Sequence, residues 1–183
     1  MVPLKSRSFL RVEGPTAQKF LQNLSTNNFH DLKPFESIDK SVVLEKDNVF
    51  YSHFLNDKGR FLFDAFVVQL PTEVGSNHTS YLLECHSDAV ELVKQHFQKF
   101  NLRKSVKISD VSEEYQVWVG LAPKGTTDST FFQGFRSFVH DASVVLPPEA
   151  IPGLLYPDPR VSLLGFRAVL PAGCNGKICT CVE

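Results

Sequence analysis

The segment His53–Asp64 constrains the fold of this chain more than any other stretch. It holds an apolar strand pattern, a turn pattern at Asn56-Asp57-Lys58-Gly59, and a second apolar pattern that extends to Leu70. Asn, Asp and Gly are the residue types that tolerate the backbone conformations of tight turns. The segment therefore predicts an antiparallel β-hairpin whose returning strand covers Arg60–Leu70.

Asp64 is the chemically unusual residue of the returning strand, because its neighbours are apolar. Side chains alternate between the two faces of a strand. We therefore expect one face with Arg60, Leu62 and Asp64, and the other with Phe61, Phe63 and Ala65. Burying an unpartnered carboxylate among apolar groups is costly, so Asp64 must reach an arginine, a backbone donor, water or a ligand. A structural ion pair and a binding site are both open interpretations.

The remaining sequence alternates irregularly between helix and strand patterns. Apolar residues at helical spacing predict a helix after Pro15 and another over about Ser87–Phe100. Strand-like stretches cover residues 9–12, 37–55 (two strands with a turn at 46–48), 81–85, 107–108, 115–121, 135–140 and 162–170. Leu146–Pro159 contains five prolines, which predicts a surface connection. Because hairpins dominate the first half, the expected fold class is α+β with a mostly antiparallel sheet and a few helices.

The composition is typical of a folded protein and argues against two classes of partner. Sixteen of the 183 residues are Phe, which predicts an aromatic-rich core. The formal net charge of −1 leaves no broad basic footprint, so nucleic-acid binding is not expected. No apolar run approaches the roughly 18–20 residues that cross a bilayer, so we expect no membrane partner.

The four cysteines do not form the pattern of a disulfide framework. Cys85 follows a strand pattern and is expected to be a buried, inert thiol. Cys174, Cys179 and Cys181 all lie in the last ten residues. Three thiolates could bind a soft metal, but structural metal sites usually need four ligands on a rigid frame. We therefore predict no metal site, and interpret residues 171–183 as an unassigned tail after one domain over residues 1–170.

Four colinear motifs resemble one known family. Phe54–Asp64 is similar to the pattern FLN-x-KGR-x-x-x-D of the folate-binding family that includes YgfZ-type proteins and the glycine-cleavage aminomethyltransferases. Leu4–Asn27 resembles the family's opening, which ends in F-L-Q-x-x-x-T-N, and Tyr81–Cys85 resembles its next strand. Asp158–Arg167 resembles the DPR…LG-x-R pattern of the mitochondrial iron–sulfur assembly branch.

This resemblance implies a fold and a ligand. The fold would be the N-terminal portion of the GcvT-like aminomethyltransferase folate-binding fold. Asp64 resembles the aspartate that lies beside tetrahydrofolate in the transferases, and the same ligand is the cofactor expected here. The further folate-binding candidates are Asn56, Gly59, Arg60 and Arg160, of which the two arginines would neutralise the glutamate tail of folate. No catalytic residue is assigned.

The departures from the family pattern favour the assembly branch over the transferases. Cys85 stands where the transferases carry an asparagine, and Arg160–Gly165 replaces their RTGYTGE stretch. The family's K-G-C-x-x-G-Q-E motif is absent, and Gly173-Cys174 is only superficially similar to it. The sequence therefore resembles a C-terminally truncated member.

The expected function follows from the resemblance alone. It is a non-enzymatic accessory factor in the maturation of mitochondrial [4Fe–4S] proteins, located in the matrix although the chain shows no clear transit peptide. Its partners would be iron–sulfur assembly proteins, their [4Fe–4S] clients and a folate-like small molecule. The alternatives are a tetrahydrofolate-dependent aminomethyltransferase-like enzyme and a partial fold without activity.

Overall fold

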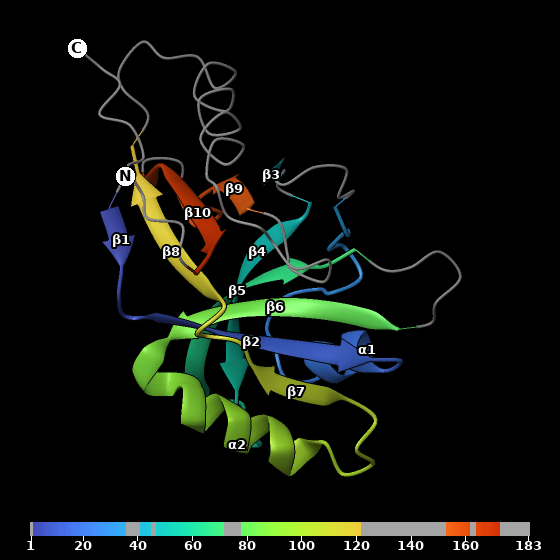
Figure 1. The fold of residues 1–183 in the computed structure, drawn as a ribbon. Helices are drawn as coiled ribbons and strands as arrows, with labels where there is room; N and C mark the ends of the chain where they lie inside the picture. The colour runs from blue at the N-terminus through green and yellow to red at the C-terminus, as the bar shows by residue number, and fades with distance from the viewer. Residues whose placement is uncertain are drawn as a thin grey trace, which may run out of the picture. The chain divides into compact units, whose positions relative to one another are not determined.

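The computed structural model describes residues 2–35, 41–44, 47–71, 78–121, 153–161 and 164–172. The chain divides into two compact units. Unit 1 comprises Met1–Lys5, Glu36–Lys46 and Glu113–Glu183, and unit 2 comprises Ser6–Phe35 and Asp47–Ser112. Figure 1 shows the helices and strands of both units. No helix in the described part of the chain is long and apolar enough to cross a membrane.

Unit 2 contains a five-stranded sheet in which every pairing is antiparallel. The strands in spatial order are β4 (Val49–Leu55), β5 (Phe61–Gln69), β6 (Thr79–His86), β2 (Arg7–Gly14) and β7 (Lys107–Asp110). The helices of this unit are α1 (Ala17–Gln22), the 3₁₀ turn η1 (Ser87–Ala89) and α2 (Val90–Phe100).

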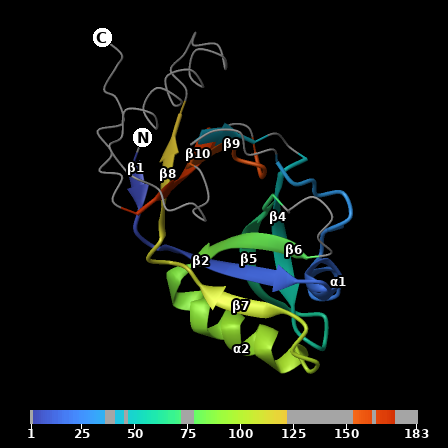
Figure 2. The ribbon, with the colours of Figure 1, turned by 45° about the vertical axis from the view of Figure 1, so that its right-hand side comes forward.

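The core of unit 2 lies between the sheet and α2, which runs along one face of it (Figure 2). The rings of Phe54 and Phe63 on adjacent strands stack with centroids 4.8 Å apart. Phe97 of α2 meets both rings edge-on, at 5.6 and 5.9 Å. Edge-to-face and offset aromatic pairs stabilise a core beyond the area they bury. The aromatic-rich core expected from composition is confirmed.

Unit 1 contains the second sheet. Its strands in spatial order are β1 (Val2–Leu4), β8 (Tyr115–Gly120), β10 (Phe166–Pro171), β9 (Gly153–Pro157) and β3 (Ser41–Val43). The pairings are antiparallel except that β3 and β9 are parallel. Together the two sheets confirm the predicted α+β class with mostly antiparallel strands and few helices.

Two predictions about the strands were wrong. The two strands expected within residues 37–55 exist, but they do not form a hairpin, because β3 pairs with β9 whereas β4 pairs with β5. The proline-rich stretch is also not entirely a surface connection, since Gly153–Pro157 is the buried strand β9. Its apolar residues Leu154, Leu155 and Tyr156 lie between prolines, and a proline at a strand's end removes no donor from its middle.

The other expected strands and helices are confirmed with shifted ends. The last strand begins at Phe166 rather than Ser162 and continues to Pro171. The predicted strand over 135–140 and the cysteines of the tail lie outside the described residues. The single domain over residues 1–170 stays a prediction.

Candidate functional site

The turn between β4 and β5 is held by its own polar groups. The Oδ1 atom of Asn56 accepts hydrogen bonds from the backbone N–H groups of Lys58 and Arg60, both at 2.9 Å. Gly59 has a φ of +71°, which glycine adopts without the steric cost that other residues pay. Asn56 and Gly59 therefore shape the turn, as predicted. Arg60 leaves the turn as an exposed side chain.

A β-bulge follows the turn and changes which side chains face which way. Leu55 pairs with Phe61 and Phe54 pairs with Phe63, so Leu62 is an extra residue on β5. A bulge interrupts the alternation of side chains. Phe61 is 60% exposed and its ring contacts His53, whereas Leu62 packs against the core. The predicted grouping of Phe61 with Phe63 and of Leu62 with Asp64 was therefore wrong.

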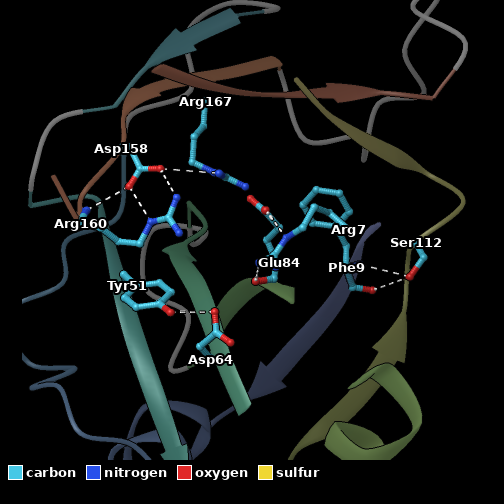
Figure 3. Close-up of polar contacts among 9 residues, drawn as sticks. All are labelled: Arg7, Phe9, Tyr51, Asp64, Glu84, Ser112, Asp158, Arg160 and Arg167. Atoms are coloured by element: carbon cyan, nitrogen blue, oxygen red, sulfur yellow. Dashed lines mark hydrogen bonds and ion pairs between the residues drawn. The ribbon is translucent and has the colours of Figure 1, made fainter. Parts of the chain in front are cut away.

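Asp64 lies on β5 directly opposite His53 of β4 and is half-buried. The hydroxyl of Tyr51 donates a hydrogen bond to its Oδ2 atom at 2.8 Å, and Figure 3 shows the two groups pointing toward each other. Within the described residues, Asp64 takes part in no ion pair. The partner is thus a neutral hydroxyl, rather than the arginine of the ion-pair interpretation.

Aromatic rings line the hairpin on either side of Asp64. The centroid of Tyr51 lies 5.2 Å from that of His53 and 5.1 Å from that of Phe66. His53 in turn lies 5.5 Å from Phe61. A carboxylate accepts hydrogen bonds, and ring faces stack on flat ligands. The arrangement can therefore bind a flat heterocycle that carries N–H donors.

Tyr51, His53, Phe61 and the buried Phe66 are residues of this candidate site that sequence reasoning missed. The available signal was the spacing of two between Tyr51 and His53, which puts them on one face of a strand. Placing them beside Asp64 also requires the register of the hairpin. That register depends on the bulge, which no residue pattern indicates.

Arg160 lies in unit 1, where a different aspartate engages it. Its Nε and Nη2 atoms donate to the two carboxylate oxygens of Asp158 at 2.9 and 2.7 Å, and its backbone N–H donates at 3.1 Å (Figure 3). The Nη1 atom of Arg167 lies 3.6 Å from the same carboxylate. Burial alone would raise the pKa of Asp158, but the bonds and charge of Arg160 and the charge of Arg167 lower it.

Gly165 completes this corner between β9 and β10. Its φ is +73°, and a Cβ atom there would collide with the carbonyl oxygen of Gly120. Its carbonyl oxygen accepts a hydrogen bond from the backbone N–H of Asp158 at 2.8 Å. The residues of the DPR…LG-x-R motif thus bind one another, and we refer to Asp158, Arg160, Gly165 and Arg167 as the arginine clamp.

The predicted site residues therefore fall into two groups. Asn56, Gly59, Arg60 and Asp64 belong to one hairpin of unit 2, although the turn and Asp64 are several residues apart along the strand. Arg160 belongs to unit 1 and to the arginine clamp. The folate contacts of all five stay predictions.

The described cysteine and histidines show no metal site. Cys85 is buried, and burial raises the pKa of its thiol to about 11, which fits the predicted inert role. No group of three or more possible ligands is found in the described ranges.

No family model matches the chain. Among curated proteins, it is 31% identical to the mitochondrial iron–sulfur cluster assembly factor IBA57 homolog of Dictyostelium discoideum, over 93% of this chain and 41% of that protein. It is 30% identical to IBA57 of Mus musculus, over 96% of this chain and 46% of that protein. The chain thus spans less than half the length of these relatives.

The fold matches a solved structure as well. The chain superimposes on the glycine cleavage system aminomethyltransferase T of Bartonella henselae with a TM-score of 0.61 and 16% identity, covering 95% of this chain and 42% of the other. At that identity the match shows the fold alone, which is the predicted portion of the GcvT-like fold. Over the residues it spans, the chain belongs to the family of the IBA57 mitochondrial iron–sulfur cluster assembly factors.

Proposed function

We propose that this chain contributes to the maturation of mitochondrial [4Fe–4S] proteins and binds a folate-like ligand on the β4–β5 hairpin. The observation that carries the ligand proposal is Asp64, a half-buried carboxylate with a neutral partner in a row of aromatic rings. The assembly role is supported by the curated relatives, whose names state it. The proposed location is the mitochondrial matrix, and the partners are assembly proteins and their [4Fe–4S] clients.

Tetrahydrofolate suits the chemistry of this hairpin. Its pterin is flat and carries amino and ring N–H donors, which a carboxylate accepts as charge-assisted hydrogen bonds. Tyr51 uses the Oδ2 atom of Asp64, so the other oxygen provides an acceptor for the ligand. The exposed ring of Phe61 offers a stacking surface, and the exposed Arg60 offers a cation for the glutamate tail.

The other predicted residues have more limited roles in this proposal. Asn56 and Gly59 hold the turn from which Arg60 projects. Arg160 is exposed but already paired with Asp158, so its contribution to ligand affinity should be the smallest of the five.

A calorimetric titration with tetrahydrofolate tests the ligand proposal. We expect micromolar binding by the full chain, and loss of about tenfold or more in affinity in Asp64→Ala, since a hydrogen bond to a charged group contributes about 1.5–3 kcal/mol. Arg60→Ala should weaken binding less, because its charge is exposed to solvent. Asp88→Ala is the matched control, as that carboxylate is 92% exposed and outside the hairpin. Absence of binding by the folded chain would refute the proposal.

The assembly role needs a separate experiment. Cells that lack the corresponding assembly factor should recover [4Fe–4S] enzyme activity when they express this chain joined to the remaining segment of a relative. If the rescue is lost in Asp64→Ala, the ligand site on the hairpin is required for the assembly role. Aminomethyl transfer in a glycine-cleavage assay would instead favour the transferase alternative, which the fold also accommodates.

A further inference from the structure

Strand β4 is at the edge of its sheet, and its outer side is covered by the segment after α1. Leu24 accepts a hydrogen bond from the backbone N–H of Leu55 at 3.0 Å, and Ser25 forms an isolated bridge with Phe54. The backbone N–H of Thr26 donates to the carbonyl oxygen of His53 at 2.9 Å. Coverage of this kind prevents an edge strand from pairing with other chains.

Two side chains of this segment bind the backbone of β4 at the site residues. The Nδ2 atom of Asn27 donates to the carbonyl oxygen of Tyr51 at 2.7 Å. The Oγ1 atom of Thr26 accepts from the backbone N–H of His53 at 3.2 Å. Thr26 and Asn27 are the last residues of the F-L-Q-x-x-x-T-N motif. The turn at Asn56 and Gly59 and the carboxylate of Asp64 do not explain why the chain carries this motif.

These contacts show how β4 faces Asp64. Because both backbone groups of His53 bond to Thr26, they point away from β5. His53 and Asp64 are therefore a non-hydrogen-bonded pair, the kind in which side chains come closest. Tyr51, two residues earlier, has the same orientation and reaches Asp64 diagonally, a distance that aromatic side chains span.

Gln22 holds the segment itself in place. Its Nε2 atom donates to the carbonyl oxygen of Asn27 at 3.1 Å, and its Oε1 atom accepts from the backbone N–H of Phe29 at 2.7 Å. Thr26 and Asn27 are thus anchored on one side to α1 and on the other to β4.

We propose that Thr26 and Asn27 are positioning residues, which fix the Tyr51 and His53 side chains beside Asp64 and so set the affinity of the hairpin for a flat, donor-bearing heterocycle. The affinity part rests on the proposed function, whereas the positioning part concerns the chain alone. If Thr26 and Asn27 only covered the edge of β4, their substitution would lower the stability of the chain but would not selectively change the Tyr51 side chain.

Isosteric substitutions test this proposal in the full chain. Thr26→Val removes the acceptor and keeps the shape, whereas Thr26→Ser keeps the hydroxyl. Asn27→Ala removes the side-chain donor to the carbonyl oxygen of Tyr51. It provides the test of positioning if Thr26→Val does not fold. Gln18→Ala is the matched control, because its Nε2 atom donates to the carbonyl oxygen of Phe29 in the same segment, at 3.0 Å, and this bond does not involve β4.

Two measurements are made on each variant. The first is the ring signal of Tyr51 in a sample with ¹³C-labelled tyrosine, assigned with Tyr51→Phe. The second is the dissociation constant for tetrahydrofolate. In Thr26→Val and Asn27→Ala we expect the ring signal to move toward the averaged position of a mobile tyrosine. We also expect an affinity about tenfold lower, as for the loss of one well-placed hydrogen bond. Thr26→Ser and Gln18→Ala should resemble the parent chain in both.

The outcomes separate this inference from the proposed function. A Tyr51 signal unchanged in Thr26→Val and Asn27→Ala overturns the positioning role, and so does an equal loss of affinity in Gln18→Ala. If the parent chain does not bind tetrahydrofolate but the Tyr51 signal responds as expected, the positioning role stands and the proposed ligand fails.

Discussion

Two aspartates of this chain lie in motifs of the same family, yet their surroundings are opposite. Asp158 is 5% exposed and its carboxylate is bound by two arginines, one of them through both oxygens. Asp64 is half-buried and receives a single hydroxyl from Tyr51 among the described residues. A carboxylate saturated by arginines has little capacity for a ligand, whereas one with a neutral partner keeps both charge and acceptors.

The difference explains why a motif does not by itself define a site. In the arginine clamp, Asp158 is bound by Arg160, by Arg167 and by the backbone of Gly165, so these contacts hold the corner between β9 and β10. The β4–β5 hairpin uses Asn56 and Gly59 for its turn but leaves Asp64, Phe61 and Arg60 accessible. The ligand proposal therefore depends on the hairpin.

The largest expected effect comes from breaking the arginine clamp. Asp158→Ala removes the buried carboxylate that pairs with Arg160 and Arg167, and breaking a buried pair costs about 3–5 kcal/mol in the free energy of unfolding. Urea denaturation checks this value. Asp64→Ala is the comparison and should cost less, about 1.5 kcal/mol, because it removes one hydrogen bond to a carboxylate that is only half-buried. Equal losses in the two variants would contradict the contrast.

Phe61 and Phe63 of β5 allow an exposed position of the hairpin to be compared with a buried one. Phe63 is 3% exposed, so Phe63→Ala should lower the free energy of unfolding by about 3–5 kcal/mol. Phe61→Ala should change it by no more than about 0.5 kcal/mol, since 60% of that residue is exposed.

The same Phe61→Ala variant should weaken tetrahydrofolate binding about threefold to tenfold, through the lost aromatic stacking. Denaturation and calorimetry on both variants measure the two effects. A large loss of stability in Phe61→Ala would show that the bulge does not turn this ring outward.

Gly165 and Gly59 have similar φ angles, so substituting each of them compares the packing of the β9–β10 corner with that of the β4–β5 turn. Gly165→Ala meets both the unfavourable φ and the carbonyl of Gly120, so it should cost about 2–3 kcal/mol. Gly59→Ala meets only the φ, with open space around it, and should cost about 1 kcal/mol. Thermal unfolding of the two variants measures which one loses more stability. A larger loss in Gly59→Ala than in Gly165→Ala would refute the difference in packing.

The smallest expected effect is on the pH dependence of stability. The pKa of Asp158 is lower in the folded chain than its usual value of 3.8. The stabilisation it provides is therefore complete above about pH 3.8 and is lost as the pH falls through the folded pKa. Unfolding free energies measured from pH 5 to pH 2 should fall less steeply in Asp158→Asn than in the parent chain. Identical slopes would show that this carboxylate does not lose its arginine partners on protonation.

The sequence predicted the hairpin well because turn chemistry is local. Asn56 and Gly59 have the roles that their residue types indicate, and the strand over Arg60–Leu70 follows from its apolar run. The partner of Asp64 could not be predicted in the same way. The pairing of Phe54 with Phe63 shifts at a bulge, and one extra residue changes which side chains share a face.

Long-range contacts were likewise beyond local patterns. The bonds from Thr26 and Asn27 to β4 join residues more than twenty positions apart. β9 was missed because prolines at its ends obscured a short buried run. The arginine clamp was recognised as a motif, but the mutual pairing of Asp158 and Arg160 could be known only from geometry.

The most direct test of the central claim is an NMR titration of the labelled chain with tetrahydrofolate. The hairpin account predicts that the largest chemical-shift changes occur at Tyr51, His53, Phe61 and Asp64, and that Asp64→Asn abolishes them. Changes confined to residues 158–167, or no changes in a folded sample, would contradict it.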